Sequence, residues 1–529
     1  MKVFFTSSKL NDKQGYARFI KPLFVAILLI YSVTELSFIA SEDLTADETS
    51  HLSYGSRILQ LNSYKRSCTT DDSKMPVSAL NALPRAFQQL FHHQLQKSDY
   101  GADDARMGRY VTFLCSLIIL IIVFIWSSQW YGAWGGIFSM ALTAFCPNFL
   151  AHSGLVTTDA YSVLILLLVL YTLWRYLTGG NEKDFIAFCI FTGLAQLVKQ
   201  TFFHLYIFLP LLVLLWMIIN KRKVLFKRVL YKIMILAVIN ILIINIGFLF
   251  YKTGQSLQQY VFVSKLFNAV QHSAGVLGRF PLPFPTPFLY GMDTVKYFDE
   301  LGSGYPESTF GIISILGYRE PGKSYWFYYL VTMLFKTPLP VLLFSAIALI
   351  RIFAKGNSNF LKRNEAILLF AFIYFLTIMS LFNHIQAGVR HILFLYPLLY
   401  VLCGKLLSTP PSRNMKLLIA IGLIWLLIST YSYFNSYISY TNELVIDKKN
   451  AYKSVGNGNL DFGQGYSAAI AYVKKHPDVR FPTAVPQKGK FIIPVGMLEN
   501  NAGEHTYDWL LPYEPIAHVH HSYLVIEVK

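Results

Sequence analysis

Long apolar runs alternate with short basic or longer polar stretches along most of this chain. A run of about 20 apolar residues can cross the hydrocarbon core of a bilayer, about 30 Å thick, as one helix. The candidate spans lie at about 19–40, 108–128, 131–150, 160–178, 185–204, 205–219, 229–250, 326–350, 365–384, 390–407 and 415–438. The pattern therefore predicts an all-α polytopic membrane domain over residues 1–439, with about 11 transmembrane helices.

The charges between these runs predict their orientation. Lys2, Lys9 and Lys13 precede the first run, which is too long for a cleaved signal peptide and is expected to stay as a signal anchor. With that end inside, every charged loop obeys the positive-inside rule. The cytoplasmic loops are then 175–184, 221–228, 351–363 and 405–416.

The same count places the polar segments on the outer face. The first external loop, 41–107, has apolar residues at helical spacing and predicts amphipathic helices along the membrane surface. The long external loop, 251–325, carries a proline-rich run from Phe280 to Pro287 and is expected to be irregular and able to close as a lid. Residues 440–529 lack long apolar runs and predict a small external α/β appendage.

Composition agrees with a membrane protein. Hydrophobic residues make up 54% of the 529 and charged residues 14%, which leaves too little polar surface for a soluble domain of this size. The formal net charge of +17 comes largely from loops between apolar runs. Membrane orientation explains that charge better than nucleic-acid binding does, so no nucleic-acid partner is expected.

Three carboxylates are candidates for chemistry at the outer boundary. Asp47 and Glu48 follow the first span, and Asp159 opens the fourth. Carboxylates at a membrane boundary can stay charged and still face a lipid-borne substrate. Each of them could instead cap a helix or sit favourably in its first turn.

Three potential cations share that boundary. Lys199 lies near the outer end of an apolar segment, and Arg390 and His391 lie at a turn between two late spans. Lys199 is equally compatible with a snorkelling anchor and with a phosphate ligand. Since the positive-inside rule does not account for outer cations, a bound anion is favoured for Arg390 and His391.

Carboxylates and cations together suit displacement at a sugar or acyl carbon whose leaving group is a phosphate. No phosphate-binding loop, zinc signature or nucleophile elbow accompanies them in the sequence. A transporter or flippase of a lipid-linked sugar is an alternative, although transporters usually keep such charges near the bilayer midplane. A ligase of whole glycans is another.

The motifs resemble the GT-C class of membrane glycosyltransferases, in the branch of protein O-mannosyltransferases and the lipid A aminoarabinose transferase. The resemblance rests on ADETSHLSYG with Asp47 and Glu48, LVTTDA with Asp159, Lys199 after a Gly-Leu-Ala run, and AGVRHILFLYP with Arg390 and His391. The stretch around Lys336 and the NLDFGQG run at 459–465 resemble a bacterial group of these enzymes.

The resemblance implies transfer of a sugar from a polyprenyl-phosphate donor to a lipid, glycan or protein, outside a bacterial cytoplasmic membrane. It implies Asp47 as the base of an inverting reaction, Glu48 and Asp159 at the acceptor or metal site, and leaves a divalent metal cofactor open. The chain departs from the family at Ala46, where proline is common, and at Phe462, where tryptophan is expected. It also lacks the β-trefoil inserts of eukaryotic protein mannosyltransferases, which argues against a protein acceptor.

Overall fold

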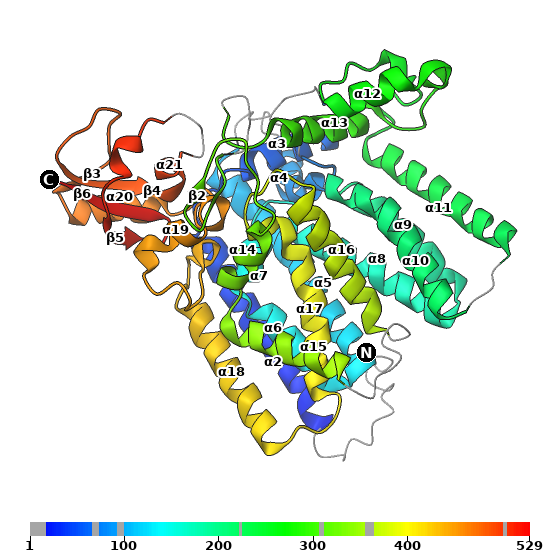
Figure 1. Cartoon of the computed structure of the whole chain (residues 1–529), viewed down its shortest axis with the longest axis horizontal. Coiled ribbons are helices and arrows are strands. Elements are labelled where there is room, and N and C mark those ends of the chain that lie inside the picture. Colours follow the sequence, from blue (N-terminus) through cyan, green and yellow to red (C-terminus); the bar gives the residue numbers. More distant parts are fainter. Residues whose placement is uncertain are drawn as a thin grey trace.

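Helices form one bundle, and a small sheet-bearing part lies at one end of it (Figure 1). This computed structural model describes residues 17–65, 74–92, 100–221, 225–305, 311–354, 364–500 and 505–529. The basic positions at 2, 9 and 13 lie outside these residues. The predicted polytopic α-helical fold is confirmed, with strands concentrated in the C-terminal part.

Seven helices of the described residues are long and apolar enough to cross a membrane. They are α2 (Ala17–Ser41), α5 (Ala102–Tyr131), α8 (Asp159–Gly179), η1 with α10 (Gln200–His204, Leu205–Ile219), α11 (Phe226–Gly247), η5 with α17 and η6 (Val389–Leu395, Tyr396–Cys403, Gly404–Leu407), and α18 (Arg413–Tyr431). Two bent pairs pass the same test and raise the count to nine: α6 with α7 (Ala133–Ala144, Pro147–Ser153) and α14 with α15 (Tyr328–Lys336, Leu339–Phe353). Two shorter helices, α9 (Glu182–Ala195) and α16 (Glu365–Leu381), complete the bundle.

Each of the predicted apolar runs contains helix, but two are broken by sharp bends. The α6–α7 pair bends by 66° and the α14–α15 pair by 114°. Proline stands at both breaks, with Pro147 opening α7 and Pro338 immediately preceding α15. Proline has no backbone N–H and is best tolerated in the first turn of a helix, which favours the start of a new helix at each of these positions.

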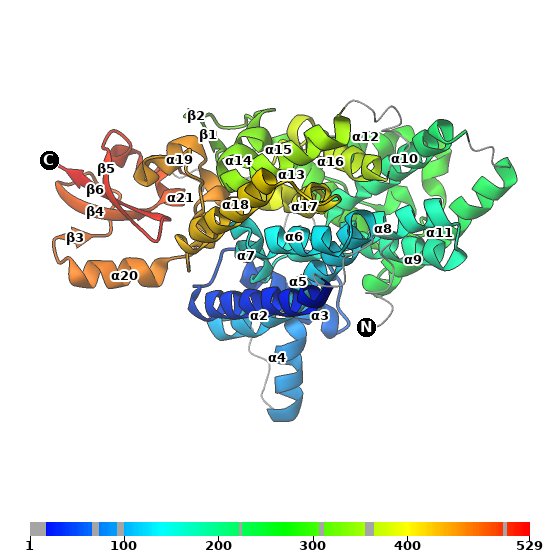
Figure 2. The ribbon, with the colours of Figure 1, turned by 90° about the horizontal axis from the view of Figure 1, so that it is seen from below.

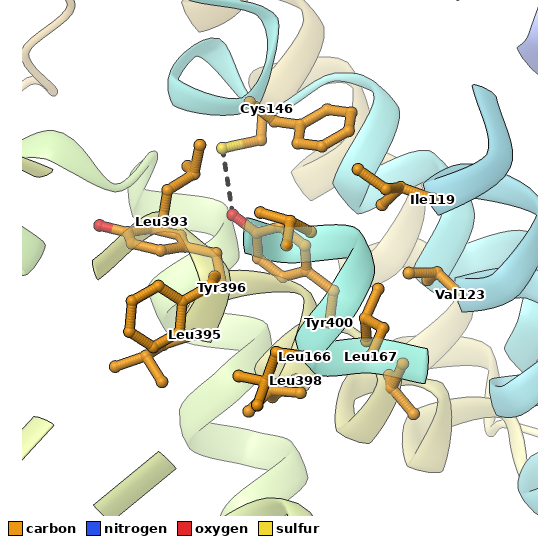
Figure 3. Close-up of a cluster of buried hydrophobic side chains, with 14 of the residues drawn as sticks. Ile119, Val123, Cys146, Leu166, Leu167, Leu393, Leu395, Tyr396, Leu398 and Tyr400 are labelled. Carbon is orange, nitrogen blue, oxygen red and sulfur yellow. Dashed lines mark hydrogen bonds between the residues drawn. The ribbon is translucent and has the colours of Figure 1, made fainter. Parts of the chain in front are cut away.

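The core between the spans is apolar but not free of polar atoms. Ile119 and Val123 of α5, with Leu166 of α8, pack around Tyr400 of α17, as Figure 3 shows. The Tyr400 hydroxyl donates a hydrogen bond of 3.1 Å to Cys146 Sγ. Burying a hydroxyl without a partner would cost free energy, and this contact satisfies it inside the bundle.

Of the two long polar segments predicted to be external, the first has two helices where amphipathic helices are expected, and the second is more helical than the sequence suggests. The first loop forms α3 (Glu48–Leu59) and α4 (Ser78–His92), and α4 stands out from the bundle in Figure 2. The second loop forms η2 (Leu257–Gln259), α12 (Lys265–Ser273), η3 (Gly275–Arg279), α13 (Thr286–Leu301), β1 (Ser314–Ile315) and β2 (Tyr318–Arg319). The expectation of an irregular loop is therefore wrong for α13. Pro285 and Pro287 occupy its cap and first turn, where proline is tolerated.

The appendage is a four-stranded sheet with short helices on both faces. It follows η7 (Tyr437–Ser439), and its elements are η8 (Lys448–Asn450), α19 (Ala451–Ser454), η9 (Asn457–Asn459), α20 (Tyr466–Lys475), β3 (Val479–Arg480), β4 (Gly489–Pro494), α21 (Val495–Leu498), η10 (Asp508–Leu510), β5 (Pro515–Val519) and β6 (Tyr523–Val528). The strand order is β3-β4-β6-β5, with β3 parallel to β4 and the other pairs antiparallel. Along β4, Ile492 packs toward α20 while Phe491 and Ile493 pack on the opposite face.

Candidate active site

A cavity of about 1350 Å³ opens where the membrane bundle, the first and second long loops and the appendage meet. Its lining includes Asp47, Asp159, Lys199, Arg390 and His391. These five residues come from widely separated parts of the sequence, and one cavity brings them together. Glu48, the sixth candidate from the sequence, does not line it.

Asp47 lies between two cations. Its Oδ1 is 3.1 Å from Lys74 Nζ, and its Oδ2 is 2.7 Å from the Arg390 guanidinium. Although Asp47 is the residue that precedes the first turn of α3, its side chain makes no capping hydrogen bond. Burial would raise the pKa of Asp47, but the charges of Lys74 and Arg390 outweigh it and hold that pKa well below its usual range. Asp47 is therefore ionised, and 29% of its side chain is exposed.

Asp159 forms a second pair with Lys199. Asp159 begins α8, and its Oδ1 is 2.9 Å from Lys199 Nζ. Lys199 lies in the turn between α9 and η1, because α9 ends at Ala195 rather than continuing to about 204 as the apolar run predicted. His391 also lines the cavity, one residue after Arg390 in η5.

Glu48 faces away from the cavity and into the protein. Its Oε1 accepts hydrogen bonds from Arg109 Nε at 2.8 Å and from the Val156 backbone N–H at 2.9 Å. Its Oε2 accepts from Arg109 and from the Thr45 backbone N–H at 3.0 Å. The side chains of Glu48 and Arg109 are almost fully buried. The structure thus differs from the expectation that Glu48 shapes the acceptor or metal site, because its partners leave neither oxygen facing the cavity.

Arg390 is held by a backbone turn and by an aromatic ring. Gly388 has φ +87°, and a Cβ there would lie 2.8 Å from the Gly458 carbonyl oxygen, so the turn before Arg390 requires glycine. The Arg390 guanidinium lies over the Phe462 ring, 4.1 Å from its centroid. Phe462 belongs to the NLDFGQG run, so this run of the appendage contacts the charged end of the cavity.

The charged end of the cavity has an excess of cations. Lys74, Lys199 and Arg390 face the carboxylates of Asp47 and Asp159. Burial lowers the pKa of the adjacent His51 to about 3, so His51 adds no charge. Three cations beside two carboxylates leave a net positive charge, which suits an anionic group such as a phosphate.

The sequence alone does not decide whether the site binds a metal ion. Within the described ranges, no group of three or more His, Cys, Asp and Glu side chains is placed to hold a metal ion. The carboxylates of Asp47 and Asp159 are each already engaged by cations. This arrangement of side chains does not fit a divalent cation held between the two carboxylates.

The sequence did not indicate three residues that build the site. Lys74 follows a polar stretch and carries no motif, and Arg109 lies within an apolar run where a positive charge is unusual. Asp461 lies in the NLDFGQG run, which contributes to the family resemblance, but the resemblance gives Asp461 no role. A buried arginine within a span was the one usable signal, since such a residue normally has an acidic partner.

The chain is similar to known membrane transferases. The family model described as dolichyl-phosphate-mannose-protein mannosyltransferase matches residues 101–247. A search of curated protein sequences gives no match.

Two solved proteins are similar over most of this chain. The crystal structure of ArnT from Cupriavidus metallidurans in the apo state has 11% identity and a TM-score of 0.45, and the match covers 95% of this chain and 97% of that one. The same protein bound to undecaprenyl phosphate gives 10% identity and a TM-score of 0.45. The archaeal oligosaccharyltransferase AglB from Archaeoglobus fulgidus, in complex with an inhibitory peptide and a dolichol-phosphate, gives 10% identity and a TM-score of 0.48 over 83% of this chain and 59% of its own.

The family match includes Asp159 and Lys199 and extends from α5 to the end of α11. The resemblance to the membrane glycosyltransferases that include the protein mannosyltransferases, predicted from the sequence motifs, is thus confirmed by the match over residues 101–247.

Proposed function

We propose that this protein is a glycosyltransferase that moves a sugar from a polyprenyl-phosphate donor to an acceptor hydroxyl. The reaction takes place on the outer face of a bacterial cytoplasmic membrane. The observation that carries the proposal is the pairing of Asp47 and Asp159 with three cations at one end of the cavity, at the ends of membrane spans. A phosphate on a lipid tail reaches such a position while its tail stays in the bilayer.

The cations bind the donor phosphate in this proposal. Lys199 and Arg390 line the cavity and pair with carboxylates, so a phosphate enters by competing for them. A phosphate offers more acceptor oxygens than a carboxylate, and Arg390 can contact two of them. As the bond to the sugar breaks, negative charge grows on the phosphate, and fixed cations stabilise that charge most in the transition state.

Asp47 acts as the general base. The acceptor oxygen bonds to the anomeric carbon from the face opposite the phosphate, and its proton passes to Asp47. The bond between the anomeric carbon and the phosphate oxygen breaks, and polyprenyl phosphate leaves with the electron pair. The sugar configuration is inverted. A donor phosphate that draws Arg390 away leaves Asp47 with Lys74 as its remaining cation, which raises its basicity when substrate is bound.

Asp159 and Glu48 act through other residues. Asp159 holds Lys199 at 2.9 Å and keeps that ammonium in the cavity before the donor arrives. Glu48 anchors the first turn of α3 to Arg109 and thereby fixes the neighbouring Asp47. Both are positioning residues in this proposal.

The test is transfer of radiolabelled sugar from polyprenyl-phosphate donors to a membrane extract by the purified protein. We expect Asp47→Asn to lower transfer by about 100-fold or more, the usual contribution of a general base. Asp103→Asn is the matched control, because Asp103 is an exposed carboxylate at the start of α5 and does not line the cavity.

Two results would count against the proposal. Full transfer by Asp47→Asn would remove Asp47 as the base. Wild-type protein that binds donor but releases no polyprenyl phosphate with any acceptor fraction would favour a transporter of lipid-linked sugar.

A further inference from the structure

The appendage supplies a large part of the cavity wall away from the paired charges. The wall residues in this part include Asp461, Tyr466, Met497, Asn500, Tyr507 and Tyr523. They come from the NLDFGQG run, the start of α20, the segments around α21 and η10, and β6. A site for a donor alone would not need this wall, so its side chains point to a second ligand.

The appendage is fixed to the membrane domain beside the cavity. The Ala46 backbone N–H donates a 2.9 Å hydrogen bond to the Phe462 carbonyl, immediately before Asp47. At the start of α20, Ser467 donates from its N–H and its hydroxyl to Asp43, at 2.8 and 2.6 Å. The Val389 N–H donates to Asn459 Oδ1 at 2.9 Å, next to Arg390. These contacts fix the position of the appendage wall relative to Asp47, the proposed base, and Arg390, the proposed phosphate ligand.

Asp461 differs from the other two cavity carboxylates. Its Oδ1 accepts a 2.9 Å hydrogen bond from the Gly463 N–H, and its Oδ2 accepts a 2.7 Å bond from the Gly496 N–H. Within the described parts of the chain, no lysine or arginine forms an ion pair with it, whereas Asp47 and Asp159 each have such a partner. Each carboxylate oxygen can accept a second hydrogen bond. Asp461 is therefore a rigidly held acceptor with unused capacity at the cavity wall.

Three tyrosines of the appendage line the same cavity as this carboxylate. Tyr466 is 57% exposed at the start of α20, and Tyr507 and Tyr523 line the cavity with it. Tyrosine presents a flat apolar face and a polar tip. A sugar ring has the complementary surface, with C–H groups on its faces and hydroxyl groups at its edge. A phosphate or carboxylate, by contrast, would be repelled by Asp461.

We propose that Asp461 and the tyrosines of the appendage form the acceptor subsite, and that the acceptor is the sugar of a glycan or glycolipid. Sugar hydroxyls donate hydrogen bonds to Asp461, the ring stacks on tyrosine, and one further hydroxyl is directed toward Asp47. This inference rests on the proposed glycosyltransferase activity, and it gives that activity an acceptor class. No bond is made or broken at Asp461.

The first experiment measures acceptor binding without catalysis. Saturation-transfer NMR uses the full-length protein in nanodiscs with methyl glycosides of glucose, mannose and N-acetylglucosamine as probes. We expect transfer signals for at least one glycoside in wild type and in Asp47→Asn, and their loss in Asp461→Asn and in Tyr466→Ala. Tyr466 is exposed, so its truncation leaves the core of the appendage intact.

The second experiment separates acceptor from donor in steady-state transfer. A hydrogen bond to a charged group contributes enough that its loss raises the acceptor KM by about tenfold or more. We expect that rise in Asp461→Asn with donor KM within twofold of wild type. Asp478→Asn is the control, because Asp478 is an exposed carboxylate of the same appendage, paired with Lys490 at 2.8 Å.

The outcomes distinguish this inference from the proposed function. Glycoside signals without any sugar transfer would contradict the proposed transferase activity but would support sugar binding by the appendage. Transfer with unchanged acceptor KM in both Asp461→Asn and Tyr466→Ala would overturn the acceptor subsite alone. Binding of serine-containing peptides instead of glycosides, lost in the same variants, would overturn the sugar as acceptor.

Discussion

Asp47 is subject to two opposing influences, and their balance determines its reactivity. Burial disfavours its charge, while Lys74 at 3.1 Å and Arg390 at 2.7 Å favour it. The cations prevail, and the pKa of Asp47 lies well below its usual range. A carboxylate held this way is ionised at every physiological pH but is a weak base. Removing one cation would make it a stronger base, which is the change that we propose for donor binding.

The effect of Lys74 on the basicity of Asp47 can be tested by measuring activity as a function of pH. Lys74→Met removes one of the two cations, so the pKa of Asp47 rises. Since the base works only when ionised, activity is then lost at a higher pH as the solution is acidified. We expect the acidic limb of the kcat/KM profile to move to higher pH by about one unit or more, because a nearby opposite charge typically shifts a carboxyl pKa by that amount.

Lys74→Arg keeps the charge and serves as the control for that pH shift. Its acidic limb should stay close to the wild-type position. An unmoved limb in Lys74→Met would mean that Lys74 does not act on the base.

The site residues were only partly accessible from the sequence. The predicted membrane topology locates Asp47, Asp159, Lys199 and Arg390 at one membrane boundary. In the structure all four line one cavity. Which carboxylate pairs with which cation did not follow, because no periodicity relates residues so far apart in the chain. Lys74 was missed for the same reason, since a lysine in a polar loop looks like any solvated charge.

At the scale of elements, the buried pair of Glu48 and Arg109 joins α3 to α5. Arg109 donates to both oxygens of Glu48 and also to the backbone carbonyls of Glu42 and Asp43, at 2.8 and 2.7 Å. The Arg109 side chain therefore connects the segment after the first span and the start of α3 to α5, the second span. Arg109→Met would leave Glu48 as a buried charge without its cation.

We expect Arg109→Met to cost about 3 to 5 kcal/mol of stability, as breaking one side of a buried ion pair typically does. The four buried cysteines at 115, 146, 189 and 403 allow the measurement, because a thiol-reactive dye reports their exposure as detergent-solubilised protein is heated. Arg106→Met is the control. It breaks the exposed pair with Asp103 on the same helix and should cost about 1 kcal/mol or less. Equal melting temperatures for the two variants would contradict the anchoring role.

The elements themselves were largely predictable, and their bends were not. Apolar runs give spans because hydrocarbon requires every backbone group to bond within its own helix. Pro147 and Pro338 were visible in the sequence, but a membrane helix can also accommodate proline as a kink. Whether the chain bends by 114° or continues depends on what packs beside it. Here the Lys336 ammonium, at the end of α14, donates to the carbonyls of Ile438 and Asn459.

On the scale of the whole molecule, the cavity requires its contributing segments to lie on one side of the membrane. The first loop, the start of α8, the α9–η1 turn, the start of η5 and the appendage all meet there. Arg175 lies toward the opposite end of α8, and Lys183 lies in the first turn of α9. The positive-inside rule then predicts that the connection between α8 and α9 is cytoplasmic and that the cavity is external.

Single cysteines in a Cys68→Ser background test this orientation. Position 68 lies outside the described residues, and the four remaining cysteines are buried. Ala484→Cys is exposed in the appendage, and Lys183→Cys is exposed in the first turn of α9. With a membrane-impermeant maleimide on bacterial spheroplasts, we expect Ala484→Cys to react at once and Lys183→Cys to react only after lysis. The reverse order would put the cavity in the cytoplasm, where the proposed donor's sugar would face the wrong side of the membrane. Labelling of both variants without lysis would place positions 183 and 484 on the same side of the membrane. The number of membrane crossings between them would then be even, which contradicts the predicted odd number.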